Sequence, residues 1–488
     1  MKQPAGPGAG GASRRRVGPV DAMWLQMDRP NNLMVVASVL FLDGVPDFDE
    51  VRRLVRDRVV ARYPVFRQRP LPPRGPLGGP SWTDDADFDL DRHVARVVLP
   101  PPGDDGALQS YIDERLALPF DRSHPLWELH LVEGYGSGAA LVCRSHHALA
   151  DGLALARVLL SLTEDARGRV ADDDLDVDVS LPPEQTRAWP LSLATSVLTV
   201  PVRLGRLGLR GAGTLTSRHR LAEATRLAWR TAEVAAVLLF SSNPPSPLAG
   251  EPGPPKRVAW SERLPIRGLT DVRRLSGATL NDVLISATAA ALHTYQLERR
   301  TDPVDLTTMV PVNVRPPDEP LPPELGNEFA LVFLRLPSAL GAPLARLAES
   351  KRRMDWIKAS PEPVLTYGLI NVIGRLTPEL GRHVVDFFAN KTIGVTTNVH
   401  GPDSVRYLAG TAVTGVLGWV PGSGRQILGI CIFTYAGNVQ VGFLSDASVV
   451  PDPERLVAAF EDELHRLVRM GRSGTRGGSR HADGHRPT

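Results

Sequence analysis

Strand-like and helix-like runs alternate in two long stretches of this 488-residue chain, residues 20–181 and 257–470. In the first stretch, the run "NLMVVASVLFLDG" predicts a strand, and the next run, "FDEVRRLVRDRVV", places apolar residues at helical spacing. In the second, "TLNDVLISATAAALHTYQLERR" predicts a helix and "RQILGICIFTYAGNVQVGFLSD" a β-hairpin that turns at Ala436-Gly437-Asn438. This pattern predicts two mixed α/β domains, an arrangement that favours a functional site at the domain interface.

The segment between the two stretches, residues 182–256, has a different composition. Between residues 187 and 230 it carries eight arginines and a single acid, Glu223, and it ends in the Pro-rich run "SSNPPSPLAGEPGPPK". Two interpretations stay open: a linker helix packed across both domains, or an interfacial helix on anionic lipid. The charged, glycine-containing ends, residues 1–19 and 471–488, are expected to be disordered tails.

Composition and charge narrow the class of protein. Hydrophobic residues make up 42% of the chain and charged residues 23%, as in globular proteins, and the net charge of +2 gives no field that would attract nucleic acid. Cys143 and Cys431 each lie inside an apolar run, which indicates buried free thiols in a reducing compartment. No apolar run approaches the ~20 residues of a membrane span, so we expect a cytoplasmic protein that contacts membranes from one side at most.

Two adjacent histidines follow the apolar start of "LVCRSHHALADG", residues 141–152, in a chain with 12 histidines. Three interpretations apply: a metal site, a hydrogen-bonded structural pair, or a general base at the end of a strand. A hydrolytic zinc site usually needs a third ligand, often within a helical H-E-x-x-H pattern, which is absent. A general base is favoured because the unperturbed pKa of histidine lies near neutral pH. The chain also lacks the G-x-S-x-G elbow of serine hydrolases.

The run "HHALADG", preceded by "PLWELHLVEG", resembles the wax ester synthase/acyl-CoA:diacylglycerol acyltransferase family of bacteria. This family belongs to the coenzyme A-dependent acyltransferase superfamily, whose signature is His-His-x-x-x-Asp-Gly. The likeness continues through most of residues 20–470. It includes "VDAMWLQMDRPNNLMVVASVLFLDG", "RYPVFRQR", "WTDDADFDLDRHV", "NDVLISA", "PVNVR", "GNEFALVFLRLP" and "TTNVHGP".

The resemblance implies two chloramphenicol-acetyltransferase-like domains, each a mixed β-sheet flanked by helices, with an active-site tunnel at their interface. Acyl-CoA would enter the tunnel from one side and the acceptor alcohol from the other. The second histidine, His147, would be the general base, His146 would support the motif, and Asp151 would hold the loop. Gly152 would give the backbone freedom to turn into the next helix. No metal and no cofactor are implied, since acyl-CoA is a substrate.

Two further motifs of the resemblance have a structural and a functional interpretation each. Pro125, Leu126 and Trp127 read as the entry of a strand with core side chains, or as residues that shape the active-site channel. Asn281 and Asp282 open a predicted helix, where such residues commonly cap the backbone, and they are also candidates to face the substrate.

Two residues of the second stretch complete the candidates. Asn398, in "TTNVHGP", either donates a hydrogen bond to substrate in the tunnel or belongs to a turn, and the turn is favoured. Arg315, in "PVNVR", is a candidate partner of Asp151, and spacing alone does not decide this pairing.

The expected activity is acyl-CoA-dependent O-acyl transfer to diacylglycerol or a long-chain fatty alcohol, which makes triacylglycerol or wax ester without an acyl-enzyme. Two alternatives remain. One is a condensation-type or polyketide-associated acyltransferase that uses carrier-protein-bound donors. The other is a non-catalytic lipid-binding protein with the same fold. The lipid acceptors favour peripheral association with the inner membrane or with lipid droplets.

Overall fold

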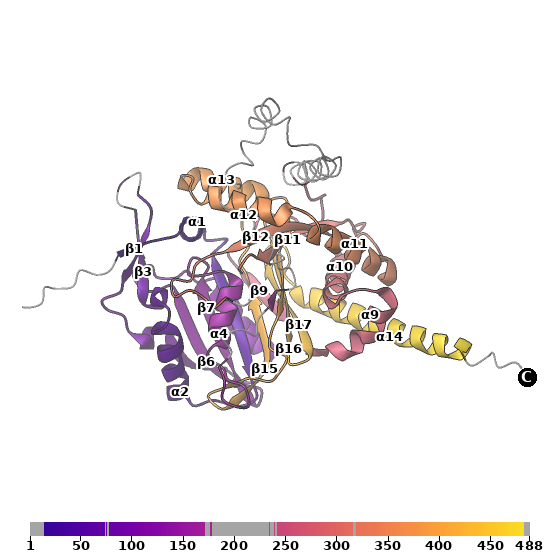
Figure 1. Ribbon diagram of the computed structural model, residues 1–488, viewed down its shortest axis with the longest axis horizontal. Helices are drawn as coiled ribbons and strands as arrows, with labels where there is room; N and C mark the ends of the chain where they lie inside the picture. The colour runs from indigo at the N-terminus through magenta and orange to yellow at the C-terminus, as the bar shows by residue number, and fades with distance from the viewer. Residues whose placement is uncertain are drawn as a thin grey trace, which may run out of the picture.

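The computed structural model in Figure 1 describes residues 14–73, 75, 78–170, 176–177, 234, 239, 242–315 and 319–482. The basic segment between residues 187 and 230 lies outside these ranges, so both interpretations of it stay predictions. Among the described helices, none is by itself long and apolar enough to cross a membrane. One sharply bent pair, Ile266–Ser276 with Leu280–Glu298, passes that test on length and composition alone.

Six strands of the described chain form the sheet of the N-terminal half, in the order β14-β15-β2-β7-β6-β5. Their bounds are Tyr407–Leu408 (β14), Thr411–Trp419 (β15), Val35–Leu42 (β2), Gly138–His146 (β7), Trp127–Tyr135 (β6) and Val94–Val98 (β5). β2 and β7 pair antiparallel, from Val35 opposite His146 to Leu42 opposite Ala139. Both strands are buried along nearly their whole length, which explains why they read as continuous apolar runs.

Two strands of this sheet come from the other end of the chain. β15 pairs with β2, with Trp419 opposite Ala37, although it lies inside the range predicted for the second domain. The predicted division into 20–181 and 257–470 therefore misplaces residues 407–419, which belong to the sheet of the N-terminal half. Pairing between strands so far apart leaves no local signal in the sequence.

Eight strands of the described chain form the sheet of the C-terminal half. Six follow the order β10 (Leu264–Pro265), β17 (Asn438–Asp446), β16 (Leu428–Tyr435), β13 (Gly394–His400), β11 (Leu306–Asn313) and β12 (Phe329–Leu336), while β8 (Asp176–Val177) pairs with β13 and β9 (Lys256–Trp260) with β17. The predicted hairpin is confirmed as β16–β17. It turns at Ala436 and Gly437, whose φ angles of 47° and 75° suit a tight hairpin turn.

Helices cover these sheets as shown in Figure 1. In the N-terminal half they are α1 (Pro19–Met27), α2 (Phe48–Leu54) with its π-helical continuation (Val55–Val60), α3 (Asp105–Leu116) and α4 (Gly152–Leu160). In the C-terminal half they are α9 (Thr270–Ser276), α10 (Leu280–Glu298), α11 (Pro343–Lys358), α12 (Glu362–Ile373), α13 (Pro378–Ala389) and α14 (Pro453–Ala482). α12 and α13 lie along the top of the view, and both contact α1.

Shorter elements complete the described chain. A small sheet joins β1 (Arg14–Arg16), β4 (Ser81–Asp84) and β3 (Gln68–Leu71), and 3-10 turns span Pro64–Arg67, Leu90–Arg92 and Ile266–Leu269. β1 places residues 14–16 in a strand, α1 begins at Pro19, and α14 continues past residue 470. Both findings differ from the predicted tails 1–19 and 471–488. Close packing accounts for the second, because a Cβ on buried Gly471 would lie 2.7 Å from the backbone nitrogen of Val272. Residues 1–13 and 483–488 lie outside the described chain.

The described chain has two large hydrophobic cores, and the first of them joins the halves. The first fills the N-terminal half and also includes Trp260, Trp419 and Phe433 from later in the chain. The second lies between the C-terminal sheet and the helices α10 and α14, with Leu284 and Phe460 among its fully buried members. Because the first core contains side chains from both halves, the interface between the halves is a buried one.

Candidate active site

The histidine pair lies where β7 ends beside β2. The backbone N–H of His147 donates to the carbonyl of Met34 (2.8 Å), which extends the pairing of the two strands by one residue. The chain then turns through residues 148–151 and enters α4. His147 therefore lies at the last paired position of a buried sheet, and the residue is 8% exposed.

The side chain of Asn327 sets the protonation of the His147 ring. Its amide nitrogen donates to Asp21 Oδ1 (2.8 Å) and to the backbone carbonyl of His147 (2.8 Å). Its amide oxygen therefore faces the ring and lies 2.9 Å from His147 Nδ1. Because an amide oxygen only accepts hydrogen bonds, Nδ1 carries the ring proton. Nε2 then holds the free lone pair that a general base requires.

Burial keeps this ring neutral, and an aromatic side chain covers one of its faces. Burial lowers the pKa of His147 to about 4, although the nearby carboxylate of Asp151 and the bond to Asn327 act in the opposite direction. The indole of Trp24 stacks on the imidazole with ring centroids 4.4 Å apart and an angle of 26° between the planes. The ring is thus in its basic form at neutral pH, with one face covered by Trp24.

His146 makes different contacts. Its Nδ1 accepts the backbone N–H of Ala148 (3.0 Å), so its Nε2 carries the proton and donates to Asp28 Oδ2 (3.2 Å). The carboxylate of Asp28 also accepts from the backbone of Met34 and from Arg122. Although burial acts to raise the pKa of Asp28, these hydrogen bonds lower it to about 2. Both ring nitrogens of His146 are occupied, which suits a supporting role and leaves no base there.

Asp151 is held by three donors. One carboxylate oxygen accepts the backbone N–H of Ala154 (2.9 Å) and caps α4. The other accepts from Arg315 Nη1 (2.9 Å) and from the backbone of Glu328 (3.1 Å). The pairing with Arg315, which spacing alone did not decide, is present and buried on both sides. Asp151 therefore ties the loop to the segment that carries Asn327.

Gly152 is expected to give the backbone freedom to turn into the next helix, and the structure does not require this. Its φ is not positive, so it needs no special backbone freedom at the start of α4. A Cβ there would lie 3.5 Å from Val420 Cγ1, an ordinary contact, and both residues line the same cavity. The missing side chain instead leaves space in the cavity that His147 also lines.

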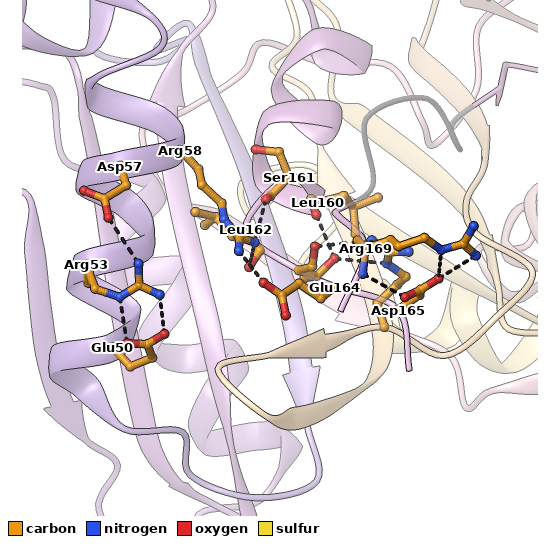
Figure 2. Close-up of polar contacts among 12 residues, drawn as sticks. Glu50, Arg53, Asp57, Arg58, Leu160, Ser161, Leu162, Glu164, Asp165 and Arg169 are labelled. Carbon is orange, nitrogen blue, oxygen red and sulfur yellow. Dashed lines mark hydrogen bonds and ion pairs between the residues drawn. The ribbon is translucent and has the colours of Figure 1, made fainter. Parts of the chain in front are cut away.

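The far end of α4 is anchored as well. Arg58, in the π-helical turn, donates to the backbone carbonyls of Ser161 (3.3 Å) and Leu162 (3.4 Å) and pairs with Glu164 (Figure 2). Asp151 caps the start of α4, and Arg58 binds the chain just past its end. The helix thus fixes the loop that holds the histidine pair.

His147 lies in the wall of an apolar cavity of about 180 Å³ between the two halves. The N-terminal half contributes Trp24 and Leu153 to the lining, and the C-terminal half contributes Phe329, Ile373, Phe388 and Val399. The site predicted at the interface is therefore present as a cavity lined mainly by apolar side chains. Such a lining suits hydrocarbon chains and excludes water from the base.

Family comparison agrees with this arrangement. Residues 17–284 match the wax ester synthase/diacylglycerol acyltransferase catalytic domain, and residues 325–468 match the C-terminal domain of the same family. The chain belongs to this acyltransferase family. It is 28% identical over 404 residues to a "Probable diacyglycerol O-acyltransferase tgs1" of Mycobacterium tuberculosis strain H37Rv, which covers 81% of this chain and 83% of the relative.

Solved structures share the fold of this family member. The wax ester synthase/diacylglycerol acyltransferase from Marinobacter aquaeolei VT8 superposes with a TM-score of 0.63 at 22% identity, over 94% of this chain and 99% of that one. The first condensation domain of the calcium-dependent antibiotic synthetase gives 0.56 at 17% identity, over 94% and 96%. The predicted two-domain α/β fold of the chloramphenicol-acetyltransferase type is therefore confirmed.

The Pro125-Leu126-Trp127 block supports this acyltransferase from outside the cavity. The carbonyl of Leu126 accepts the backbone N–H of His146 (2.9 Å), and the indole N–H of Trp127 donates to the carbonyl of Phe66 (2.8 Å). None of the three residues of the block lines the cavity that contains His147. The contacts favour the interpretation as a strand entry with core side chains.

Asn281 and Asp282 lie at the start of α10, on the other side of the C-terminal sheet. Asp282 and Thr279 form a reciprocal capping box, with bonds of 2.8 and 3.2 Å. The amide oxygen of Asn281 accepts from Asn398 Nδ2 (2.9 Å). None of these residues lines the His147 cavity, so capping is what the structure shows for Asp282. Asn398 lies within β13, so the favoured turn role is wrong.

Sequence reasoning missed Asp21, Trp24 and Asn327. All three lie in blocks that carry the family resemblance, "VDAMW" and "GNEF", but nothing local distinguishes them from core or turn residues. Only the fold brings α1 and the start of β12 against the end of β7. Among the described residues, no three His, Cys, Asp or Glu side chains converge as metal ligands would.

Proposed function

We propose that this family member transfers acyl groups from acyl-CoA to diacylglycerol, to a long-chain fatty alcohol, or to both, and so makes triacylglycerol or wax ester. The observation that carries the proposal is the neutral ring of His147 in an apolar cavity, with Nε2 free of hydrogen bonds to the described residues. Family membership supports the classes of donor and acceptor. The proposed reaction uses acyl-CoA as a substrate and requires no bound metal or cofactor.

The proposed step is direct attack on the thioester. Nε2 of His147 takes the proton of the acceptor hydroxyl while its oxygen bonds to the acyl carbon. Collapse of the tetrahedral intermediate breaks the C–S bond, and the CoA thiolate leaves and receives the proton from the imidazolium. A thiol pKa of about 8.5 makes the thiolate a competent leaving group. The products are the ester and free CoA, and the histidine returns to its neutral form without an acyl-enzyme.

Three side chains around the base assist this step without touching the reacting atoms. Asn327 accepts the Nδ1 proton throughout, so that only Nε2 exchanges a proton. Asp21 holds the amide of Asn327 in the required orientation. The carboxylate of Asp151 favours the charged ring and so stabilises the imidazolium that forms in the transition state. We therefore regard Asn327 and Asp21 as positioning residues.

A panel of acceptors tests this proposal. Purified protein is incubated with palmitoyl-CoA and either diacylglycerol or hexadecanol, and the lipid products are identified by mass spectrometry. We expect triacylglycerol, wax ester or both, together with one free CoA for each ester. Release of CoA without any ester would indicate a thioesterase and would contradict the proposal.

The same assay distinguishes this proposal from the alternative in which the acyl donor is bound to a carrier protein. Palmitoyl-CoA and palmitoyl-acyl carrier protein are compared as donors with the same acceptor. We expect transfer from the CoA thioester. Transfer from the carrier protein alone would favour a condensation-type acyltransferase, and transfer from neither would favour a lipid-binding protein.

The lipid acceptors lead us to propose that the protein works at the surface of the inner membrane or of lipid droplets. The basic segment 187–230 is the candidate for this contact on its charge alone. Sedimentation with anionic liposomes should retain the protein, and substitution of the arginines in this segment should release it. Unchanged binding after that substitution would exclude the segment as the contact.

A further inference from the structure

Helix α13 carries apolar side chains on two of its sides. On the inner side, Val385 and Phe388 line the His147 cavity. On the other side, Leu380 and Phe387 lie seven residues apart, a spacing that places them on one face of a helix, and we call them the outer stripe. Leu380 is 52% exposed and Phe387 is 47% exposed. α13 lies on the outside of the molecule, along the top of the view in Figure 1. A wall of the cavity therefore also presents an apolar face to the surroundings.

Two cations without an acidic partner lie next to the outer stripe. Arg375, in the α12–α13 turn, is exposed, and Arg382, in α13, is half-buried. Neither forms an ion pair or a side-chain hydrogen bond with any described residue. Of the acids of α13, Asp386 pairs with Arg29 (2.6 Å), which leaves Glu379 alone to oppose the two arginines. Exposed apolar side chains beside an excess of positive charge are typical of helices that bind the surface of anionic lipid.

A narrow groove lies between α1 and the turn that joins α12 to α13. Its lining includes Gln26 of α1 and Thr377 of the turn. Met23 and Ile373 line this groove and also line the His147 cavity. These two side chains are therefore the wall that separates the groove from the cavity.

The groove is closed in this structure. Its volume is about 10 Å³, which is room for about one water molecule. Its walls come close together at Gly374, where a Cβ would lie 2.7 Å from the backbone of Pro19. Among the described residues, no hydrogen bond or ion pair joins α1 to the α12–α13 turn. Widening the groove therefore separates apolar contacts only, and the unbranched side chain of Met23 can adapt its shape to such a movement.

We propose that the outer stripe of α13, together with Arg375 and Arg382, docks on an anionic phospholipid surface, and that the lipid acceptor leaves this surface through the groove to reach His147. This inference rests on the proposed function and assigns its acceptor side. The acyl chains of the acceptor then pass from lipid to the apolar cavity without crossing open solvent. The docking surface is separate from the basic segment 187–230, so its variants test it independently of that segment.

Vesicle binding tests the docking surface without any need for activity. Sedimentation with vesicles of phosphatidylglycerol and phosphatidylcholine measures the affinity of the parent protein and of Leu380→Gln/Phe387→Gln. This double variant should bind about tenfold or more weakly, because two half-exposed apolar side chains no longer enter the lipid. Leu275→Gln/Leu297→Gln is the matched control, since these leucines of α9 and α10 are 55% and 52% exposed and lie outside the groove and the cavity. The control should bind like the parent protein.

The two arginines are tested with the same vesicles. Arg375→Gln/Arg382→Gln should weaken binding to the anionic vesicles about tenfold and leave binding to pure phosphatidylcholine vesicles unchanged, because an anionic surface attracts each nearby cation. Arg56→Gln/Arg300→Gln is the control, since it removes two exposed arginines that form no ion pair with the described residues. Equal losses in the two double variants would reflect the net charge of the protein alone and would overturn the docking surface.

The passage is tested with the acceptor. Thr377→Trp places a large side chain in the groove, at an exposed position whose own side chain makes no capping bond. With palmitoyl-CoA as donor, the kcat/KM for diacylglycerol in vesicles should fall about tenfold or more, because the acceptor path is filled. The vesicle affinity and the Tm should stay those of the parent protein. Lys358→Trp, at the exposed end of α11 and outside both linings, should keep the parent kcat/KM. An unchanged kcat/KM in Thr377→Trp would overturn the passage.

The outcomes also separate this inference from the proposed function. Equal vesicle affinities for Leu380→Gln/Phe387→Gln and an active parent protein would overturn the docking surface and leave the proposed function intact. A parent dimer that dissociates in this double variant, measured by light scattering, would show that the outer stripe binds a second copy and would also overturn the docking surface. A parent protein that binds vesicles through the outer stripe but forms no ester from palmitoyl-CoA would overturn the proposed function and leave the docking surface in place.

Discussion

The amide oxygen of Asn327 lies 2.9 Å from Nδ1 of His147, and the two residues come from opposite halves of the chain. The amide cannot rotate without losing its bonds to Asp21 and to the carbonyl of His147. The second half of the protein therefore decides which nitrogen of the histidine acts as a base. Variants of Asn327 and Asp21 therefore test how the base is oriented, while His147 itself stays in place.

Asn327→Ala should lower the kcat for acyl transfer about ten- to a hundredfold, because the loss of one buried hydrogen-bond partner costs about 1–3 kcal/mol. The KM for both substrates should change little, since Asn327 does not line the cavity. Steady-state kinetics with palmitoyl-CoA checks this. A rise in KM with unchanged kcat would show that the residue binds substrate instead of orienting the base.

Asp21→Ala should also lower kcat, because the amide of Asn327 would lose the acceptor that fixes its orientation. Burial raises the pKa of Asp21, while the two bonds from Asn327 oppose that rise, so the carboxylate and the amide act as one unit. The double variant with Asn327→Ala should then lose little more than Asn327→Ala alone. Additive losses in this double-mutant cycle would contradict a single orienting chain.

The pH dependence of the reaction should reflect the buried base. Burial lowers the pKa of His147 to about 4, so the ring stays unprotonated well below its ordinary value of about 6.5. The kcat/KM for acyl transfer should stay level from about pH 8 to about pH 5 and fall as the pH approaches 4. Circular dichroism at each pH checks that the protein remains folded. An acid limb near pH 6.5 would contradict a desolvated base.

Trp24→Ala should move that acid limb upward. The indole covers one face of the imidazole at 4.4 Å, so its removal admits water and weakens the desolvation that lowers the pKa of His147. Trp24→Phe keeps an aromatic cover and is the matched control, with a smaller shift. Identical pH profiles for the alanine variant and the parent would show that Trp24 does not shield the ring.

Arg315→Met should destabilise the fold. It leaves the buried carboxylate of Asp151 without its cation, a change that costs about 3 kcal/mol or more of unfolding free energy. Arg53→Met is the control, because the ion pairs of Arg53 with Glu50 and Asp57 lie on the surface (Figure 2). Thermal unfolding should show a clear drop in Tm for the first variant and almost none for the second. Equal Tm values would mean that Asp151 does not depend on Arg315.

The sequence is informative where the signal is local. The apolar run before His146 predicts a buried strand, the Asn-Asp pair predicts the start of α10, and the turn at Gly437 predicts a hairpin. The pairing of β15 with β2 has no such signal, because its register depends on residues far apart in the chain. For the same reason the general base could be proposed from its motif, whereas the residue that orients it, Asn327, could not.

The central claim is that His147 removes the proton of the acceptor hydroxyl. Single-turnover release of CoA from palmitoyl-CoA, with and without the acceptor lipid, measures this step most directly in the parent protein and in His147→Ala. We predict that the variant binds palmitoyl-CoA normally and that its acceptor-dependent rate falls about a hundred- to ten-thousandfold. An acceptor-dependent rate near that of the parent protein would contradict the account.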